Sequence, residues 1–106
     1  MDLKDMGDKA VLVEIGERIN RQRLNRNITQ VDLARRAGVT RIVVQRLENG
    51  HGCNFESLIK ILRSLDLIDQ LDAFLPRPGI SPVQLAKLKG NERLRASHPG
   101  RKQRAG

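Results

Sequence analysis

Two short helical patterns meet at a glycine near the middle of the chain. Between Thr29 and Gly50, apolar residues recur at helical spacing on both sides of Gly38. Thr29 and Thr40 stand at the starts of these patterns, where a threonine hydroxyl can cap a helix. Gly38 stands where the turn needs a positive φ, which glycine adopts without strain. The stretch therefore predicts two short helices joined by a tight turn.

The second of these helices divides into an apolar and a polar face. Val44 and Leu47 form its buried stripe, and Val43 lies at the border of that stripe. The side chains left outside are mostly polar or basic: Arg41, Ile42, Gln45, Arg46 and Asn49. This layout is typical of a helix-turn-helix that reads DNA.

A further helical pattern precedes this pair. We expect a helix from about Ala10 to Arg26, capped by Asp8, with Asn27 in the left-handed conformation after its end. Gly16 inside this helix costs about 1 kcal/mol relative to alanine. Either close packing against another helix offsets that cost, or the helix is locally weak.

Two more helices are expected after the pair. Asn54 is a suitable N-cap for the fourth helix. Ile61 lies beside the apolar stripe of this helix, which consists of Phe55, Leu58, Ile59, Leu62 and Leu65. Asp66 marks a break, and a short fifth helix follows that Pro76 ends. The predicted fold class is therefore all-α, with five helices in the domain.

The apolar residues after Asn54 exceed what a small domain needs, because the first three helices already provide a core. We interpret the excess as a subunit interface between two copies of the chain. The residues predicted for this interface are Ile61, Leu67, Ile68, Leu71, Phe74 and Leu75.

Three parts of the chain differ in composition. Residues 1–9 are polar and patternless and predict an N-terminal arm, residues 10–75 form the helix-turn-helix and dimerisation domain, and residues 76–106 follow as linker, short helix and basic tail. The short helix starts at Ser81-Pro82 and is expected to end at Gly90. Beyond it five basic residues face one acidic residue, so we expect a flexible tail.

The charge of the chain favours a polyanionic partner. Its net charge is +8, which suits nucleic acid or an acidic membrane surface. Between Ala10 and Gly52 eight arginines face four acidic residues, whereas between Cys53 and Leu75 two basic residues face four acidic ones. We therefore expect the helix-turn-helix half to face the polyanion.

Other features lower the rank of several classes of protein. Phe55 and Phe74 are the only aromatic residues, so stacking on single-stranded bases has little to use. No apolar run approaches the roughly 18 residues of a membrane span, and the single cysteine, Cys53, predicts a reducing cytoplasm. We find no paired catalytic carboxylates, no nucleophile–base set and no Cys/His metal motif, and predict no enzyme, cofactor or metal.

Three short motifs resemble the lambda-repressor-like family, the Cro/CI or XRE type of five-helix DNA-binding domain. They are T-Q-x-x-L-A from Thr29, A-G-V-T from Ala37 and R-L-E-N-G from Arg46, and the resemblance extends from about Ile15 to Leu75. It implies a bacterial or phage regulator whose third helix lies in the major groove of double-stranded DNA while the second crosses the backbone.

The resemblance also implies roles for single residues. Thr40, Arg41, Ile42 and Arg46 would meet base edges, and Gln30 and Asn49 would bind phosphates. Arg35 and Arg36 by themselves fit a solvated helix surface, but in a helix-turn-helix at least one of them is expected to bind a phosphate as well. Arg23 and Glu48 would form a structural pair. Independently, the guanidinium forks of Arg41 and Arg46 suit guanine O6 and N7, each contact being worth about 1–3 kcal/mol of discrimination. Ile42 fits a thymine methyl or a partly buried helix position equally well.

A narrower resemblance concerns the C-terminal half. The run L-R-S-L-D-L-I-D-Q-L-D-A-F-L-P-R-P-G-I-S-P-V-Q-L-A-K-L-K-G and its basic end are similar to HipB-type regulators, the antitoxins of HipA-like kinases. This implies a dimer that represses its own operon and binds a kinase toxin. The alternative is a stand-alone XRE-type repressor, of the phage or restriction-modification controller kind, without a toxin partner.

Overall fold

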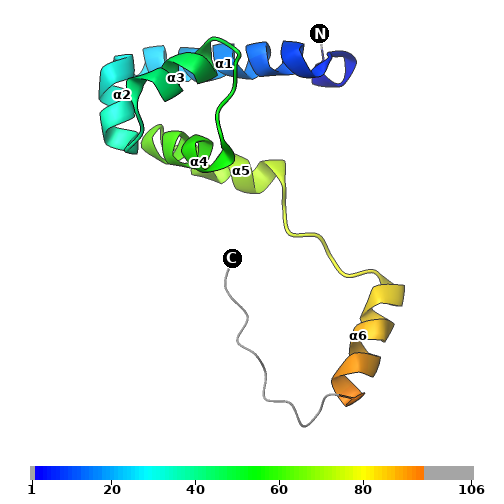
Figure 1. Cartoon of the computed structure of the whole chain (residues 1–106). Coiled ribbons are helices and arrows are strands. Elements are labelled where there is room, and N and C mark those ends of the chain that lie inside the picture. Colours follow the sequence, from blue (N-terminus) through cyan, green and yellow to red (C-terminus); the bar gives the residue numbers. More distant parts are fainter. Residues whose placement is uncertain (1, 95–106) are drawn as a thin grey trace. The chain divides into compact units, whose positions relative to one another are not determined.

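The structure is a computed structural model that describes residues 2–94. Within this range it contains a short 3-10 helix, η1, and six α-helices, and no strand (Figure 1). The bounds are η1 Leu3–Asp5, α1 Asp8–Asn25, α2 Gln30–Ala37, α3 Arg41–Glu48, α4 Phe55–Ser64, α5 Ile68–Phe74 and α6 Pro82–Leu94. The all-α prediction is confirmed. The chain divides into two compact units, Met1–Leu75 with α1 to α5 and Pro76–Gly106 with α6.

The N-terminal helix begins earlier than expected. Gly7 is the N-cap of α1, so Asp8 lies in the first turn of the helix and is not its cap. An acidic side chain there interacts favourably with the positive end of the helix dipole. At the other end Asn27 has a φ of 60°, in the left-handed region that asparagine tolerates better than most residues, as the sequence predicted.

The caps around the tight turn form as predicted. The backbone N–H of Asp32 donates to Thr29 Oγ1 at 3.0 Å, and that of Val43 donates to Thr40 Oγ1 at 3.3 Å. Gly38 ends α2 with a φ of 74°, where a side chain would be strained. These local hydrogen bonds start α2 and α3 at the expected threonines.

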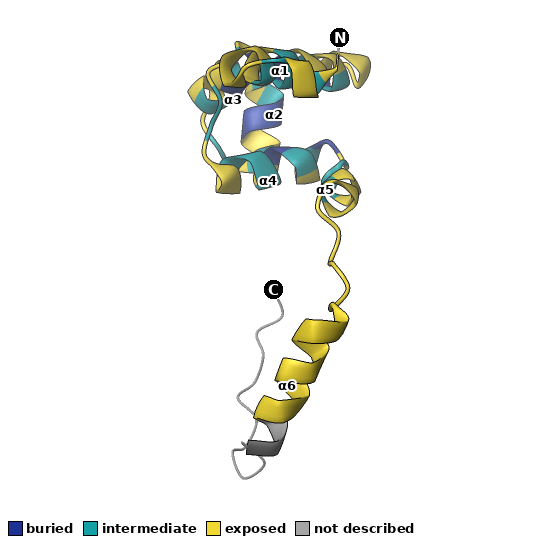
Figure 2. Ribbon diagram, turned by 90° about the vertical axis from the view of Figure 1, so that its right-hand side faces the viewer, coloured by how far each residue is buried: buried dark blue, intermediate teal, exposed yellow. Residues whose placement is uncertain are grey.

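The core of the first unit is aliphatic. α2 packs against α3 and α4, while α1 packs against α3. The ribbon of α2 lies between those of α1 and α4 and carries much of the buried colour (Figure 2). The buried core residues are Ile19, Ile28, Leu33, Ala34, Val44, Leu47, Ile61 and Leu65.

Close packing accounts for the glycine inside α1. A Cβ built on Gly16 would lie 2.8 Å from the carbonyl oxygen of Glu48 and closer still to that of Leu47. Both atoms belong to the backbone of α3, so an alanine would push the two helices apart. Close packing of α1 against α3 therefore offsets the cost of Gly16, which was the first of the two alternatives for this glycine.

The buried face of α4 differs from the predicted stripe. Leu65 is fully buried as predicted, but Ile61, expected beside the stripe, is fully buried too, whereas Phe55, expected in the stripe, is 57% exposed. Because Ile61 belongs to the core of a single copy, its assignment to a subunit interface is wrong. The start of α4 is as predicted, since Ser57 N donates to Asn54 Oδ1 at 2.8 Å.

The C-terminal helix runs further than predicted. The backbone N–H of Gln84 donates to Ser81 Oγ at 3.1 Å, and Pro82 is the first residue of α6. The helix continues through Gly90 to Leu94, because an interior glycine weakens a helix by about 1 kcal/mol without having to end it. The predicted tail from residue 95 onward lies outside the described residues.

Candidate nucleic-acid interface

The two faces of α3 differ sharply in exposure. Val44, Leu47 and Glu48 are buried against the rest of the unit, while Arg41 and Arg46 are exposed and Ile42 is 63% exposed. Of the two interpretations of Ile42, partial burial therefore does not hold in the free chain. The predicted base-reading side chains thus share one accessible face of a helix whose opposite face is fixed.

The two arginines of this face are free to take a new partner. Among the residues that the structure describes, neither Arg41 nor Arg46 makes a side-chain hydrogen bond or an ion pair. Thr40 is exposed, and its Oγ1 already accepts from Val43 N, so its hydroxyl can still donate. The face therefore offers donors to acceptor atoms such as guanine O6 and N7.

The predicted phosphate ligands lie in different environments. Arg36 and Asn49 are exposed. Arg35 Nη2 donates to Asp32 Oδ1 at 2.8 Å, but the arginine side chain is 71% exposed. Exposed pairs of this kind are worth about 0–1 kcal/mol, so a phosphate can compete with Asp32 for Arg35.

Gln30 points to a different partner from the one expected. Its Nε2 donates to Glu48 Oε1 at 3.0 Å, and the side chain is half-buried. The amide nitrogen carries a second N–H, so a phosphate contact would have to use that hydrogen. The phosphate contact of Gln30 therefore stays a prediction, and the hydrogen bond to Glu48 was not expected from the sequence.

A buried ion pair lies beneath the exposed face. Arg23 Nε donates to Glu48 Oε2 at 2.7 Å and Arg23 Nη2 donates to Glu48 Oε1 at 3.0 Å. Arg23 Nη1 also donates to the carbonyl oxygen of Ile28 at 2.7 Å. The two side chains are 9% and 2% exposed. Arg23 therefore joins α1 to the end of α3 and to the loop before α2.

Two amides complete the surroundings of Glu48. Asn20 Nδ2 donates to Glu48 Oε1 at 2.8 Å, alongside Gln30. The pair of Arg23 with Glu48 was expected from the resemblance, but the hydrogen bonds of the two amides to Glu48 were not. The available signal for Asn20 was its place three residues before Arg23, on the same face of α1.

These hydrogen bonds decide the direction in which the pKa of Glu48 moves. Burial alone would raise the pKa of this carboxyl, but hydrogen bonds from Arg23, Gln30 and Asn20, with the charge of Arg23, outweigh burial and lower it. The carboxylate therefore stays ionised in the folded chain.

The lowered pKa predicts a contribution of Glu48 to acid sensitivity. Ionised Glu48 stabilises the fold fully above its usual pKa of 4.5, and this stabilisation is lost as the pH falls through the lower pKa of the folded state. Urea unfolding at a series of pH values below 4.5 should therefore give a shallower fall in stability for Glu48→Gln than for the wild type. Glu56→Gln, on an 81% exposed side chain, is the control, and equal slopes for the two variants would contradict the prediction.

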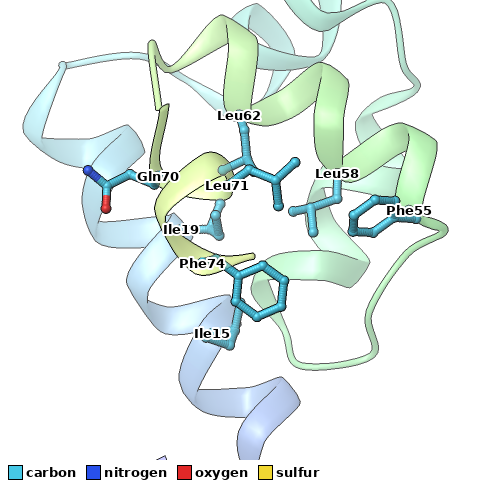
Figure 3. Close-up of a pocket in the computed structure, with 8 residues that line it drawn as sticks. All are labelled: Ile15, Ile19, Phe55, Leu58, Leu62, Gln70, Leu71 and Phe74. Atoms are coloured by element: carbon cyan, nitrogen blue, oxygen red, sulfur yellow. The ribbon is translucent and has the colours of Figure 1, made fainter. Parts of the chain in front are cut away.

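An apolar groove lies on the same unit, between α1, α4 and α5 (Figure 3). Its volume is about 310 Å³. Both phenylalanines of the chain line it, Phe55 from α4 and Phe74 from α5. The other lining residues are Ile15, Ile19, Leu58, Leu62, Gln70 and Leu71.

Residues 2–94 show no sign of a metal site or a membrane span. Over this range no three His, Cys, Asp or Glu side chains gather closely enough to hold a metal ion. No helix there combines the length and apolar character needed to cross a membrane. Burial raises the pKa of the Cys53 thiol, which disfavours the reactive thiolate.

Comparisons with known proteins bear on the same segment. Among solved structures, a chain of the SinR protein/SinI protein complex is 24% identical, with 79% of this chain and 99% of that chain covered and a TM-score of 0.46. No curated protein matches. Residues 19–69 match the family model described as helix-turn-helix, and that segment contains both α2 and α3. Residues 19–69, slightly less than half of the chain, are therefore similar to the helix-turn-helix family, in agreement with the motif that the sequence predicted between Thr29 and Gly50.

Proposed function

We propose that this chain is a sequence-specific repressor that binds a near-palindromic operator as a dimer, with α3 in the major groove of double-stranded DNA. The observation that carries this proposal is the exposed face of α3, where the guanidinium forks of Arg41 and Arg46 have no partner within residues 2–94 while the buried Arg23–Glu48 pair holds the end of the helix. Recognition of base edges in the major groove requires accessible side chains on a helix whose orientation is fixed. Both conditions are met at Arg41 and Arg46.

The proposed contacts fall into two groups. Arg41 and Arg46, with Thr40 and Ile42, meet base edges and set the sequence that is bound. Arg35, Arg36, Asn49 and the second N–H of Gln30 meet phosphates, which position the protein without reading sequence. The excess of arginine between Ala10 and Gly52 supports this electrostatic part of binding.

The experiment that tests the proposal is selection of bound sequences from random double-stranded DNA. A dimer with one reading helix per copy should enrich two half-sites related by two-fold symmetry, with centres about 34–36 Å or a multiple of this apart. Enrichment of a single unpaired half-site would contradict the dimer. No enriched sequence at all would contradict sequence-specific binding.

The proposed dimer uses the surface around α5. Phe74 and Leu75 are 70% and 73% exposed, and Ile68 and Leu71 are half-buried. Leu71 and Phe74 also line the apolar groove (Figure 3), so apolar surface continues from α5 towards α1 and α4. Leu67 packs against the core of its own copy, so it contributes less to the proposed dimer interface than Phe74 and Leu75. Burial of exposed apolar surface supports the association of two copies.

Phe74→Asp should convert dimers into monomers. The substitution places a charge on the apolar surface, but the side chain is already 70% exposed, so the fold of one copy should be kept. Analytical ultracentrifugation should then report a monomer, circular dichroism should be unchanged, and affinity for a two-fold operator should fall at least about tenfold. Ile80→Asp, on a 56% exposed linker residue, serves as the control. A dimer that survives Phe74→Asp would remove α5 from the interface.

We also infer an antitoxin role, in which the chain represses its own operon and binds a HipA-like kinase. Besides the resemblance of its C-terminal half, Val83 and Leu85 of α6 are 68% and 42% exposed, which is apolar surface suited to a protein partner. A HipA-like kinase encoded beside this protein should bind the wild type and bind Leu85→Asp more weakly. The alternative, a stand-alone repressor, predicts operator binding and no such kinase partner.

A further inference from the structure

The carboxylate of Glu48 is a meeting point of three helices. Glu48 is the last residue of α3, Gln30 is the first residue of α2, and Asn20 lies within α1. We propose that Asn20 and Gln30 are positioning residues of the regulator, which act through Glu48 to fix the angle of α3 against α2. This inference rests on the proposed function of α3 as the reading helix.

The hydrogen bonds are shared unequally between the two oxygens of the carboxylate. Oε2 accepts from Arg23 Nε, whereas Oε1 accepts from Arg23 Nη2 at 3.0 Å, Asn20 Nδ2 at 2.8 Å and Gln30 Nε2 at 3.0 Å. Among the described residues no buried side-chain nitrogen or oxygen lacks a partner. The end of α3 is therefore held by donors from both of the other helices.

The ion pair and the amides have separable roles. Arg23 alone can neutralise the buried charge of Glu48, so loss of an amide leaves the ion pair and the fold in place. Asn20 and Gln30 are neutral and half-buried, so replacing either of them leaves the charge balance of the Arg23–Glu48 pair unchanged. The amides restrain the orientation of α3, because Asn20 binds Glu48 Oε1 to α1 and Gln30 binds the same oxygen to α2.

Gln30 further connects the two kinds of DNA contact. One N–H of its amide is bound to Glu48, and the second is the donor proposed for a phosphate. A phosphate held there would fix the start of α2, and the hydrogen bond to Glu48 would pass this restraint to the end of α3. The angle of a reading helix must be held to within about 10–20°, so this link matters for base recognition.

The test uses Asn20→Ala and Gln30→Met, which remove the donors and keep the Arg23–Glu48 pair. Asn25→Ala is the matched control, since Asn25 is an exposed asparagine of the same helix. Full-length proteins are compared in three measurements. These are thermal unfolding, affinity for the selected operator and for random duplex DNA, and the NMR shifts of the Arg41 and Ile42 amides in the free protein.

Positioning predicts a loss of specificity. Asn20→Ala should remain folded, lose about threefold to tenfold in operator affinity and keep its affinity for random DNA. Gln30→Met should also remain folded, but it loses the proposed phosphate donor as well, so its affinity should fall for both DNAs and by about threefold to tenfold more for the operator. The amide shifts of Arg41 should also move, although this residue lies about 10 Å along α3 from Glu48. Asn25→Ala should change none of these quantities.

Two results would overturn the inference. Equal losses on operator and random DNA would make Gln30 a phosphate ligand only, because phosphate contacts carry no sequence information. Unchanged Arg41 and Ile42 shifts in both donor variants would show that α3 does not depend on the amides. If one variant fails to fold, the other decides the result. If the wild type shows no sequence preference, the proposed function fails, and the amide shifts decide the inference by themselves.

Discussion

Arg23→Ala is expected to lower the free energy of unfolding by about 3–5 kcal/mol, because it leaves the Glu48 carboxylate buried without its countercharge. The Glu48 side chain is 2% exposed, so water cannot replace the guanidinium. Small domains have a total stability of only about 5–15 kcal/mol, and the variant should unfold at a much lower urea concentration. Urea denaturation followed by circular dichroism measures the difference.

Arg18→Ala provides the comparison for Arg23→Ala. Arg18 also pairs with a glutamate, Glu14, at 3.0 Å, but its side chain is 54% exposed. Its loss should cost at most about 1 kcal/mol. If Arg23→Ala costs no more than Arg18→Ala, the buried pair does not hold α3 in place, and the account of how the reading helix is supported is wrong.

Arg46→Ala is expected to weaken operator binding by about 1–3 kcal/mol, the value of one guanidinium–guanine contact. The side chain is exposed and makes no ion pair among the described residues, so thermal stability should not change. Binding to operators with single base changes, measured by fluorescence anisotropy, should show that the variant loses its preference at one position in each half-site.

Arg36→Ala is the control for base reading. Arg36 is exposed on α2, where the proposal assigns it to a phosphate. Its loss should weaken binding to all sequences alike and reduce the salt dependence by about one unit of slope. If the two variants behave identically, α3 has no special part in base recognition.

The turn and its two helices were predictable because their determinants are local. Thr29 and Thr40 each accept a hydrogen bond from a backbone N–H three residues ahead, and Gly38 takes the left-handed conformation that ends α2. None of these interactions depends on the rest of the fold. The start of α4 at Asn54 was predictable for the same reason.

The rotation of α4 was not predictable in the same way. Its sequence carries apolar residues on more than one face, so periodicity alone cannot choose between Phe55 and Ile61 for the core. Packing against α2 makes the choice, and Ile61 becomes fully buried. The excess of apolar residues did indicate an exposed apolar surface, since Phe74 and Leu75 are exposed. It did not indicate which apolar residues belong to that surface, since Ile61 is buried.

The exposure of Arg41 and Arg46 on α3 was predictable from the sequence, whereas the hydrogen bonds around Glu48 were not. The positions of Arg41 and Arg46 follow from helical periodicity around Val44 and Leu47. The hydrogen bond from Asn20 to Glu48 joins residues 28 positions apart, and that from Gln30 to Glu48 turns inward a side chain expected to face a phosphate. Contacts of this kind depend on how α1, α2 and α3 pack together, and local sequence patterns do not determine that packing.

The most direct test of base reading by α3 is selection from random double-stranded DNA, carried out in parallel with the wild type and Arg46→Ala. A two-fold symmetric motif is expected for the wild type, and the same motif without its preference at one position per half-site is expected for Arg46→Ala. An identical motif from both proteins, at equal affinity, would contradict the claim that α3 reads the operator.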